Sequence, residues 1–308
     1  GTPIENSLAE LWSIFDFLMP QYLFNYHYFQ KQYENDIVKN NDEEKTKQLK
    51  KLVTPFILRR NKKEVLTELP DKIEQNIILP FNDEEEKIYV ANLAKANKEL
   101  QELYDLEGSD KMQILKLLTR LRQLCLEPRL VYDNIDQPSS KLKACMELIK
   151  TMQENKQKVL LFSSFTSVLD LIAEECQKAG ITYYMLTGST NKEDRRELVS
   201  RFQKDDTTVF LISLKAGGTG LNLTSAETVI HFDPWWNVSA QNQATDRAYR
   251  IGQKNNVQVF NLVMKDSVEE KIIELQKRKK ELADMFVENN SGGLSQMSKE
   301  DILSLFTM

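Results

Sequence analysis

Four polar residues in the second half of the chain have a spacing that suits chemistry on a phosphate group. Gln243, Asp246, Arg247 and Arg250 recur at intervals of three and four, so they would share one face of a helix that starts near Ser239. A guanidinium group stays protonated and can donate two parallel hydrogen bonds to phosphate oxygens. Arginine pairs are also common on solvated helix faces. The spacing alone therefore leaves open whether this face binds phosphate or only carries salt bridges.

The residues before this helix predict the elements that must position it. The apolar run at 209–212 predicts a strand that is buried on both faces. A loop with Gly217, Gly218 and Gly220 follows, and such a loop lets backbone N–H groups approach a phosphate or a nucleic-acid backbone. The β-branched run at 228–232 predicts a second strand, which ends at Asp233-Pro234.

The same alternation of strand and helix extends over residues 137–265. Apolar runs predict further strands, and amphipathic segments between them predict helices at 140–152, 168–178 and 192–203. Because the connections are short, the expected fold is of the α/β class, a mainly parallel sheet with helices on both faces. A mostly helical region precedes it, and a long helix with an apolar seam follows at 266–287.

Small hydroxyl residues and glycines recur where the predicted strands end. Each of them alone suits a turn or a helix cap, but the carboxyl ends of parallel strands meet at one edge of a sheet, where ligands bind. The sequence therefore predicts one binding edge, built from Ser163, Ser164, Thr187, Gly188, Ser189, Ser213, Gly217 and Gly218.

Several long strings resemble the motifs of one protein family. QATDRAYRIGQ resembles the last helicase motif of SWI/SNF-type ATPases, which belong to the superfamily-two helicase-like translocases, and KAGGTGLNLTSAETVIHFDPWWN resembles the motif before it. KVLLFSSFTSVLDLI and LTGST resemble two further motifs of the second RecA-like lobe of that family. GTPIEN resembles the motif that closes the first lobe, and LTRLRQLCLEP resembles a helical insertion between the lobes.

The resemblance implies roles for individual residues. Arg247 and Arg250 would be arginine fingers, and the nucleotide side would include Gln243, Gly220, Gly1 and Thr2. The DNA side would consist of Ser163, Ser164, Thr187, Gly188, Ser189, Ser213, Lys215, Gly217, Gly218 and Trp235. It implies no protein ligand for a metal in this chain.

Three positions depart from the family pattern. Ser164 stands where glutamine is frequent, and its shorter hydroxyl can still meet a phosphate or a sugar. Val238 stands where proline is usual, and proline would pre-set the start of the helix. Leu126-Glu127-Pro128 stands in place of Asn-His-Pro, so the role of that polar pair is not carried over.

The resemblance also implies a division into four parts. Residues 1–80 would be the tail of the first motor lobe with a helical protrusion, and 81–136 the helical insertion and inter-lobe segment. Residues 137–265 would be the RecA-like helicase C-terminal lobe, and 266–308 a brace helix with a short terminal helix.

The sequence contains neither GxxxxGK[ST] nor a DExH-type quartet, which in this family hold the triphosphate and its magnesium ion. We therefore expect ATP and Mg²⁺ to be held mainly by a first lobe that is missing here, so that the chain alone is inactive as an ATP hydrolase. With that lobe, the expected activity is DNA-stimulated ATP hydrolysis coupled to translocation on double-stranded DNA and to remodelling of a DNA-bound protein.

Two alternatives are weighed against this function. The first is a non-catalytic DNA-binding module on the same fold, which the two arginines disfavour. The second is a dinucleotide- or methyl-donor enzyme that uses the glycine loop. It fails because a strand rather than a helix follows the loop, and no acidic ribose partner comes about 20 residues later.

The composition is that of a globular protein. Of 308 residues, 41% are hydrophobic and 28% charged, and the net charge of −5 argues only weakly against nucleic acid, because a local basic groove suffices. No apolar run is long enough for a transmembrane helix, GTPIENS lacks the features of a signal peptide, and we expect no membrane partner. The expected location is a bacterial cytoplasm and nucleoid, or a nucleus. Cys125, Cys145 and Cys176 are scattered and predict buried thiols, and His231 a structural role.

Overall fold

The structure, a computed structural model, describes residues 8–40, 42–57, 70–105, 111–217, 221–286 and 305–306. The described residues form two compact units. The smaller unit contains residues up to 57 together with 236–239 and 275–286, and the larger unit contains the remainder. The predicted division into four consecutive parts stays a prediction.

Short helices build the smaller unit. They are α1 (Leu8–Leu18), α2 (Tyr26–Phe29), the π-helix Gln30–Glu34, α3 (Asn35–Asn40), α4 (Glu43–Val53) and the 3₁₀-helix Thr54–Phe56. The apolar seam of α1 buries Leu8, Leu11 and Phe15, as predicted for an amphipathic helix. Asp42 caps α4, since its carboxylate accepts from two backbone N–H groups at 2.9 and 3.0 Å. The first turn predicted for the N-terminal helix lies outside the described residues.

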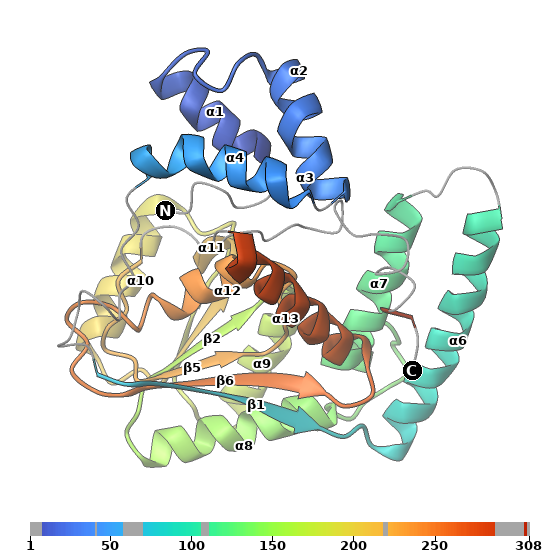
Figure 1. Cartoon of the computed structure of the whole chain (residues 1–308). Helices are drawn as coiled ribbons and strands as arrows, with labels where there is room; N and C mark the ends of the chain where they lie inside the picture. The colour runs from blue at the N-terminus through green and yellow to red at the C-terminus, as the bar shows by residue number, and fades with distance from the viewer. Residues whose placement is uncertain are drawn as a thin grey trace. The chain divides into compact units, whose positions relative to one another are not determined.

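A six-stranded sheet forms the centre of the larger unit (Figure 1). Its strands are β1 (Lys72–Leu79), β2 (Val159–Ser163), β3 (Tyr183–Leu186), β4 (Val209–Ser213), β5 (Thr228–His231) and β6 (Val257–Met264). The spatial order is β1-β6-β5-β2-β4-β3, and every neighbouring pair is parallel. The parallel sheet is confirmed. β1, which the predicted boundaries place ahead of the lobe, is an edge strand of this same sheet.

Helices cover both faces of the sheet, as predicted. On one face α8 (Ser140–Glu154) and α9 (Thr166–Lys178) pack against a core that includes Leu161. On the other face, residues from α10 (Lys192–Lys204) and α12 (Val238–Thr245) join Leu160 and Phe162. Successive side chains of a strand point to opposite faces, so the central strand β2 is buried along its whole length.

The predicted helical insertion is a pair of helices, α6 (Asp83–Asp105) and α7 (Lys111–Leu126), followed by the 3₁₀-helix Pro128–Leu130. The backbone N–H of Val268, at the start of α13 (Val268–Phe286), donates to the hydroxyl of Tyr89 on α6 at 2.8 Å. Glu127, one of the residues that depart from the family pattern, is buried and accepts from Arg129 and from the backbone N–H of Ser139. It therefore ties the end of α7 to the start of α8.

A buried ion pair links α8 to α13. Lys141 donates to both carboxylate oxygens of Glu269 at 2.7 Å, and both side chains are almost fully buried. Glu269 also accepts from the backbone N–H of Met264 at 2.8 Å. The three cysteines are free and buried, which confirms that prediction. In the parts of the chain that the structure describes, no helix combines the length and apolarity that crossing a membrane requires.

Candidate functional site

The carboxyl ends of β2, β4 and β5 bring the predicted polar residues to one edge of the sheet. In the register of the parallel strands, Ser163 lies opposite Ser213, and Phe162 lies opposite His231. Gly217 and Asp233 follow these strands after a few residues. The prediction that the strand ends form one edge is therefore confirmed for the residues that the structure describes.

The helix predicted to carry the two arginines is shorter than the spacing suggests. α12 ends at Thr245, and Arg247 and Arg250 lie in the turns that follow it. The carbonyl of Arg247 accepts from the backbone N–H of Leu223, and that of Ala248 accepts from the side chain of Gln253. The N–H of Leu223, a distant residue, thus occupies a carbonyl that a continuing helix would use, and the shared helix face is wrong as a description of the two arginines.

The two guanidinium groups nevertheless bond to the same stretch of chain, the glycine segment at 217–221. Arg247 donates through Nε to the carbonyl of Gly217 at 3.0 Å, and Arg250 donates through an Nη to the carbonyl of Leu221 at 3.4 Å. Burial, and then the positive charge of Arg250, lower the pKa of Arg247. An arginine starts from a pKa so high that Arg247 remains cationic at neutral pH. The site thus holds two positive charges at the ends of the glycine segment.

One helical turn, α11 (Leu214–Gly217), comes directly after β4 and leads into the glycine segment. The sequence predicts a loop at this point. A Cβ atom at Gly217 would lie 2.9 Å from Cε1 of Phe162, closer than such atoms approach in proteins. Glycine is required at 217 because the backbone passes so close to the core of the sheet.

Asp233 ties together the serines that the sequence assigns to DNA. Ser163 donates through its hydroxyl to Oδ1 of Asp233 at 2.7 Å, and Ser164 donates through its backbone N–H to the same oxygen at 3.0 Å. The Ser164 hydroxyl also bonds to Oδ2. Ser163 and Ser213 are buried, whereas Ser164 is half-buried. Their assignment to DNA stays a prediction.

The other predicted DNA contacts differ in exposure. Gly188, Ser189 and Lys215 are exposed, and Trp235 is partly buried against the core beside α12. Thr187 and Ser189 share a hydrogen bond of 2.8 Å between their hydroxyls. The exposed residues lie outside the core and are available to a large ligand.

On the nucleotide side, Gln243 is half-buried on α12. Gly1, Thr2, Gly218 and Gly220 lie outside the described residues, and their assignments stay predictions. Within the described ranges, no group of three or more His, Cys, Asp and Glu side chains is arranged to hold a metal ion.

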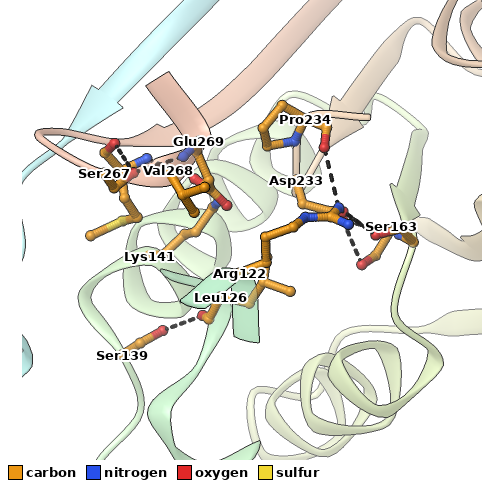
Figure 2. A network of polar contacts seen from close by, with 12 residues as sticks. Arg122, Leu126, Ser139, Lys141, Ser163, Asp233, Pro234, Ser267, Val268 and Glu269 are labelled. Atoms are coloured by element: carbon orange, nitrogen blue, oxygen red, sulfur yellow. Dashed lines mark hydrogen bonds and ion pairs between the residues drawn. The ribbon is translucent and has the colours of Figure 1, made fainter. Parts of the chain in front are cut away.

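The main residue that sequence reasoning misses is Arg122 on α7. It forms an ion pair of 2.8 Å with Asp233, and both side chains are buried (Figure 2). Its Nη2 also donates to the hydroxyl of Ser164 at 2.9 Å and to the carbonyl of Pro234 at 3.3 Å. In the sequence, Arg122 falls between Leu121 and Leu124 on the apolar side of the predicted helix. A charged residue at such a position is the signal that could have found it.

His231 has a structural place next to this cluster. Its Nε2 lies 2.9 Å from the hydroxyl of Thr245 on α12, and its ring stacks on Phe162 at 5.7 Å between centroids. Burial lowers the pKa of His231 to about 4, although the nearby carboxylates of Glu74 and Asp233 act in the opposite direction. The ring is therefore neutral at pH 7 and links β5 to α12.

Comparisons with known proteins agree with this architecture. The SNF2-related domain family matches residues 1–130, and the helicase conserved C-terminal domain family matches residues 140–252. The SWI2/SNF2 ATPase core of Sulfolobus solfataricus, solved in complex with double-stranded DNA, superposes with a TM-score of 0.64 and 33% identity over 99% of this chain and 65% of that one. The chain belongs to the SNF2 family.

Two curated relatives of this SNF2 chain show the range of the family. An uncharacterized ATP-dependent helicase of Mycoplasma pneumoniae is 38% identical over 99% of the chain, and the ISWI chromatin-remodeling complex ATPase ISW1 of Saccharomyces cerevisiae is 33% identical over 99%. The SNF2 chain spans only 29% and 28% of the lengths of these relatives. Its larger unit is a RecA-like SNF2 lobe, which confirms the predicted fold class.

Proposed function

We propose that this chain is the C-terminal part of a DNA-stimulated ATPase that translocates on double-stranded DNA and remodels a protein–DNA complex. One observation supports it most: Arg247 and Arg250 bring two guanidinium groups to the ends of one segment at the carboxyl edge of a RecA-like sheet. Phosphoryl transfer needs positive charge at the oxygens of the transferred group more than it needs covalent chemistry.

The two arginines would act as fingers on ATP that a separate lobe holds. The half-buried Arg247 is already oriented by its bond to Gly217, so little reorganisation is needed when a phosphate arrives. Arg250 is exposed and can approach a nucleotide from outside the unit. Fingers of this kind contribute a factor of about 10³–10⁵ to turnover.

ATP supplies the phosphoryl group, and a donor set of two guanidinium groups fits its phosphates. The amide of Gln243, on the same helix–turn segment, would face the nucleotide, together with Gly220, Gly1 and Thr2. The described residues offer no cluster of carboxylates for Mg²⁺, so we assign the ion to the ATP-binding lobe.

The DNA partner would lie along the edge formed by the strand ends. Lys215 supplies an exposed positive charge there, and the exposed Gly188 and Ser189 allow close approach of a phosphate backbone. These groups read no base pattern, so binding would be independent of sequence and would weaken with salt. The remodelled target would be another DNA-bound protein, in the nucleoid of a bacterium or in a nucleus.

The test is ATP hydrolysis by a protein that joins an ATP-binding lobe to this chain, measured with and without double-stranded DNA. We expect DNA to stimulate the parent. We expect Arg250→Ala to lower turnover by at least about 10³ while nucleotide and DNA still bind. Arg201→Ala is the matched control, since Arg201 lies exposed on α10 beside Glu197 and should behave as the parent. Displacement of a third strand from a DNA triplex then tests translocation.

Two outcomes would reject the proposal. A parent that binds DNA without hydrolysing ATP would favour the non-catalytic DNA-binding module. Unchanged turnover in Arg250→Ala would mean that the arginine serves only the fold. The 308-residue chain without that lobe should bind DNA but release no phosphate.

A further inference from the structure

Arg122 contacts two of the loops that carry predicted DNA contacts, although it belongs to the helical insertion. The loop after β2 contains Ser164, and the loop after β5 contains Asp233 and Trp235. Arg122 bonds to Ser164 at 2.9 Å and to Asp233 at 2.8 Å, and its guanidinium carbon lies 5.8 Å from the centre of the Trp235 ring. Figure 2 shows its side chain reaching from α7 toward Asp233 and Pro234.

The contacts of Arg122 hold the two loops in place and do not expose its charge to a ligand. Arg122 is 7% exposed and Asp233 is 5% exposed, so neither charge can reach a phosphate without movement of the loops. The guanidinium carbon also lies 5.0 Å from the centre of the Phe165 ring, which adds a cation–π contact. The Ser164 hydroxyl accepts from Arg122 and bonds to Asp233, so the three polar groups orient one another.

We propose that Arg122 is a positioning residue for DNA binding: from α7 it fixes the loops after β2 and β5, which carry Ser164 and Trp235, at the predicted DNA-binding edge. The inference rests on the proposed function of this edge. Nη2 of Arg122 bonds to both loops while the planar guanidinium lies near two rings, whereas a lysine offers a compact ammonium without a plane to stack. The helical insertion would then set the shape of the DNA-binding edge without touching DNA.

The position of the effect distinguishes this role from catalysis. Arg122 contacts the loops after β2 and β5, whereas Arg247 bonds to the end of α11. Loss of the Arg122 contacts to these two loops should therefore raise the DNA concentration that half-saturates ATP hydrolysis. Turnover at saturating DNA should stay nearly as in the parent. A general loss of folded protein would instead lower turnover at every DNA concentration.

The experiment compares Arg122→Lys with Arg120→Lys in the protein that includes the ATP-binding lobe. Arg120 is a matched control on the same helix, because its guanidinium bonds to Asn92 and Tyr132 and not to either loop. We expect Arg122→Lys to raise the half-saturating concentration of a double-stranded oligonucleotide about tenfold or more, with turnover at saturation changed less than about twofold. Arg120→Lys should match the parent.

A second variant covers the case in which Arg122→Lys fails to fold. Arg122→Met with Asp233→Asn removes both buried charges together and keeps an amide oxygen that Ser163 and Ser164 can bond. It should show the same selective rise in half-saturating DNA. The inference is overturned if the folded variants bind DNA as tightly as the parent, or if only turnover falls. A parent that neither binds DNA nor responds to it would instead reject the proposed function itself.

Discussion

Arg247 donates through Nε to the backbone oxygen of Gly217 at 3.0 Å, which joins the turns after α12 to the end of α11. The two residues are thirty positions apart in the chain and meet at the carboxyl edge of the sheet. The bond orients the guanidinium group, and the closeness of Gly217 to Phe162 fixes the carbonyl that accepts it. The position of the proposed finger thus depends on a glycine that lies against the core of the sheet.

Gly217→Ala should destabilise the protein. The new methyl group would lie 2.9 Å from Cε1 of Phe162, whose side chain is fully buried and cannot move freely. Overpacking of this kind costs about 1–3 kcal/mol in the free energy of unfolding, which urea titration measures. Gly188→Ala is the control, since nothing lies within 4 Å of its added Cβ, and a change below about 0.5 kcal/mol is expected. Equal effects at the two glycines would contradict the close approach at Gly217.

Glu269→Gln should be among the most destabilising single changes. It leaves the Lys141 ammonium buried without its counter-charge, which costs about 3–5 kcal/mol. Adding Lys141→Met removes the orphaned charge, and the introduced amide oxygen can still accept from the N–H of Met264, so the double variant should recover at least half of the loss. Glu197→Gln, at the exposed pair with Arg201, should have a several-fold smaller effect in the same urea titrations. A double variant no more stable than Glu269→Gln would show that the ion pair is not the cause.

DNA binding should depend on salt through Lys215. The residue is exposed directly after β4, at the predicted DNA edge. Lys215→Gln should lower the slope of log affinity against log salt concentration by about 0.9, equally for DNA of any sequence. Lys178→Gln is the control, because Lys178 ends α9 at the opposite edge of the sheet and is paired with Glu175 at 2.7 Å. Fluorescence anisotropy with a labelled duplex measures both. A slope that Lys215→Gln leaves unchanged would place the DNA elsewhere.

Most of the fold follows from local patterns. β2 and β4 are continuous apolar runs because both of their faces are covered, and such runs are recognisable in the sequence. α6 begins after Asn82, whose side chain accepts from two N–H groups of its first turn, and that capping position is equally recognisable. Polar residues after buried strands then predict the binding edge, because parallel strands end together.

What the sequence does not predict depends on partners far along the chain. Arg122 and Asp233 are 111 positions apart, and nothing near either residue indicates the other. Asp233 is recognisable only as the stop of a strand. The end of α12 at Thr245 also involves a distant partner, since the carbonyl of Arg247 accepts from the N–H of Leu223, while the local spacing of the arginines favours a longer helix. Tertiary contacts override local preference at these points.

Acid should destabilise the protein through His231. Burial lowers the pKa of His231 to about 4, from an ordinary value of about 6.5 in the unfolded chain. Between these values the unfolded state binds more protons, so the free energy of unfolding rises with pH in this window. The contribution of neutral His231 is fully present above about pH 6.5 and is lost as the pH falls toward about 4. A difference of about 2.5 pH units corresponds to about 3 kcal/mol.

His231→Gln isolates this contribution. An amide can replace the bond to Thr245 but takes up no proton, so the variant should lose much of the increase in unfolding free energy between about pH 5 and 6.5. The charged groups that act on the ring of His231, namely Glu74, Asp233 and Lys72, are the same residues in the parent and the variant. His27→Gln, the same change at an exposed histidine, is the matched control. If His231→Gln also keeps the parent slope in urea titrations at several pH values, then His231 binds a proton as readily in the folded as in the unfolded protein, and the link to Thr245 does not require neutral histidine.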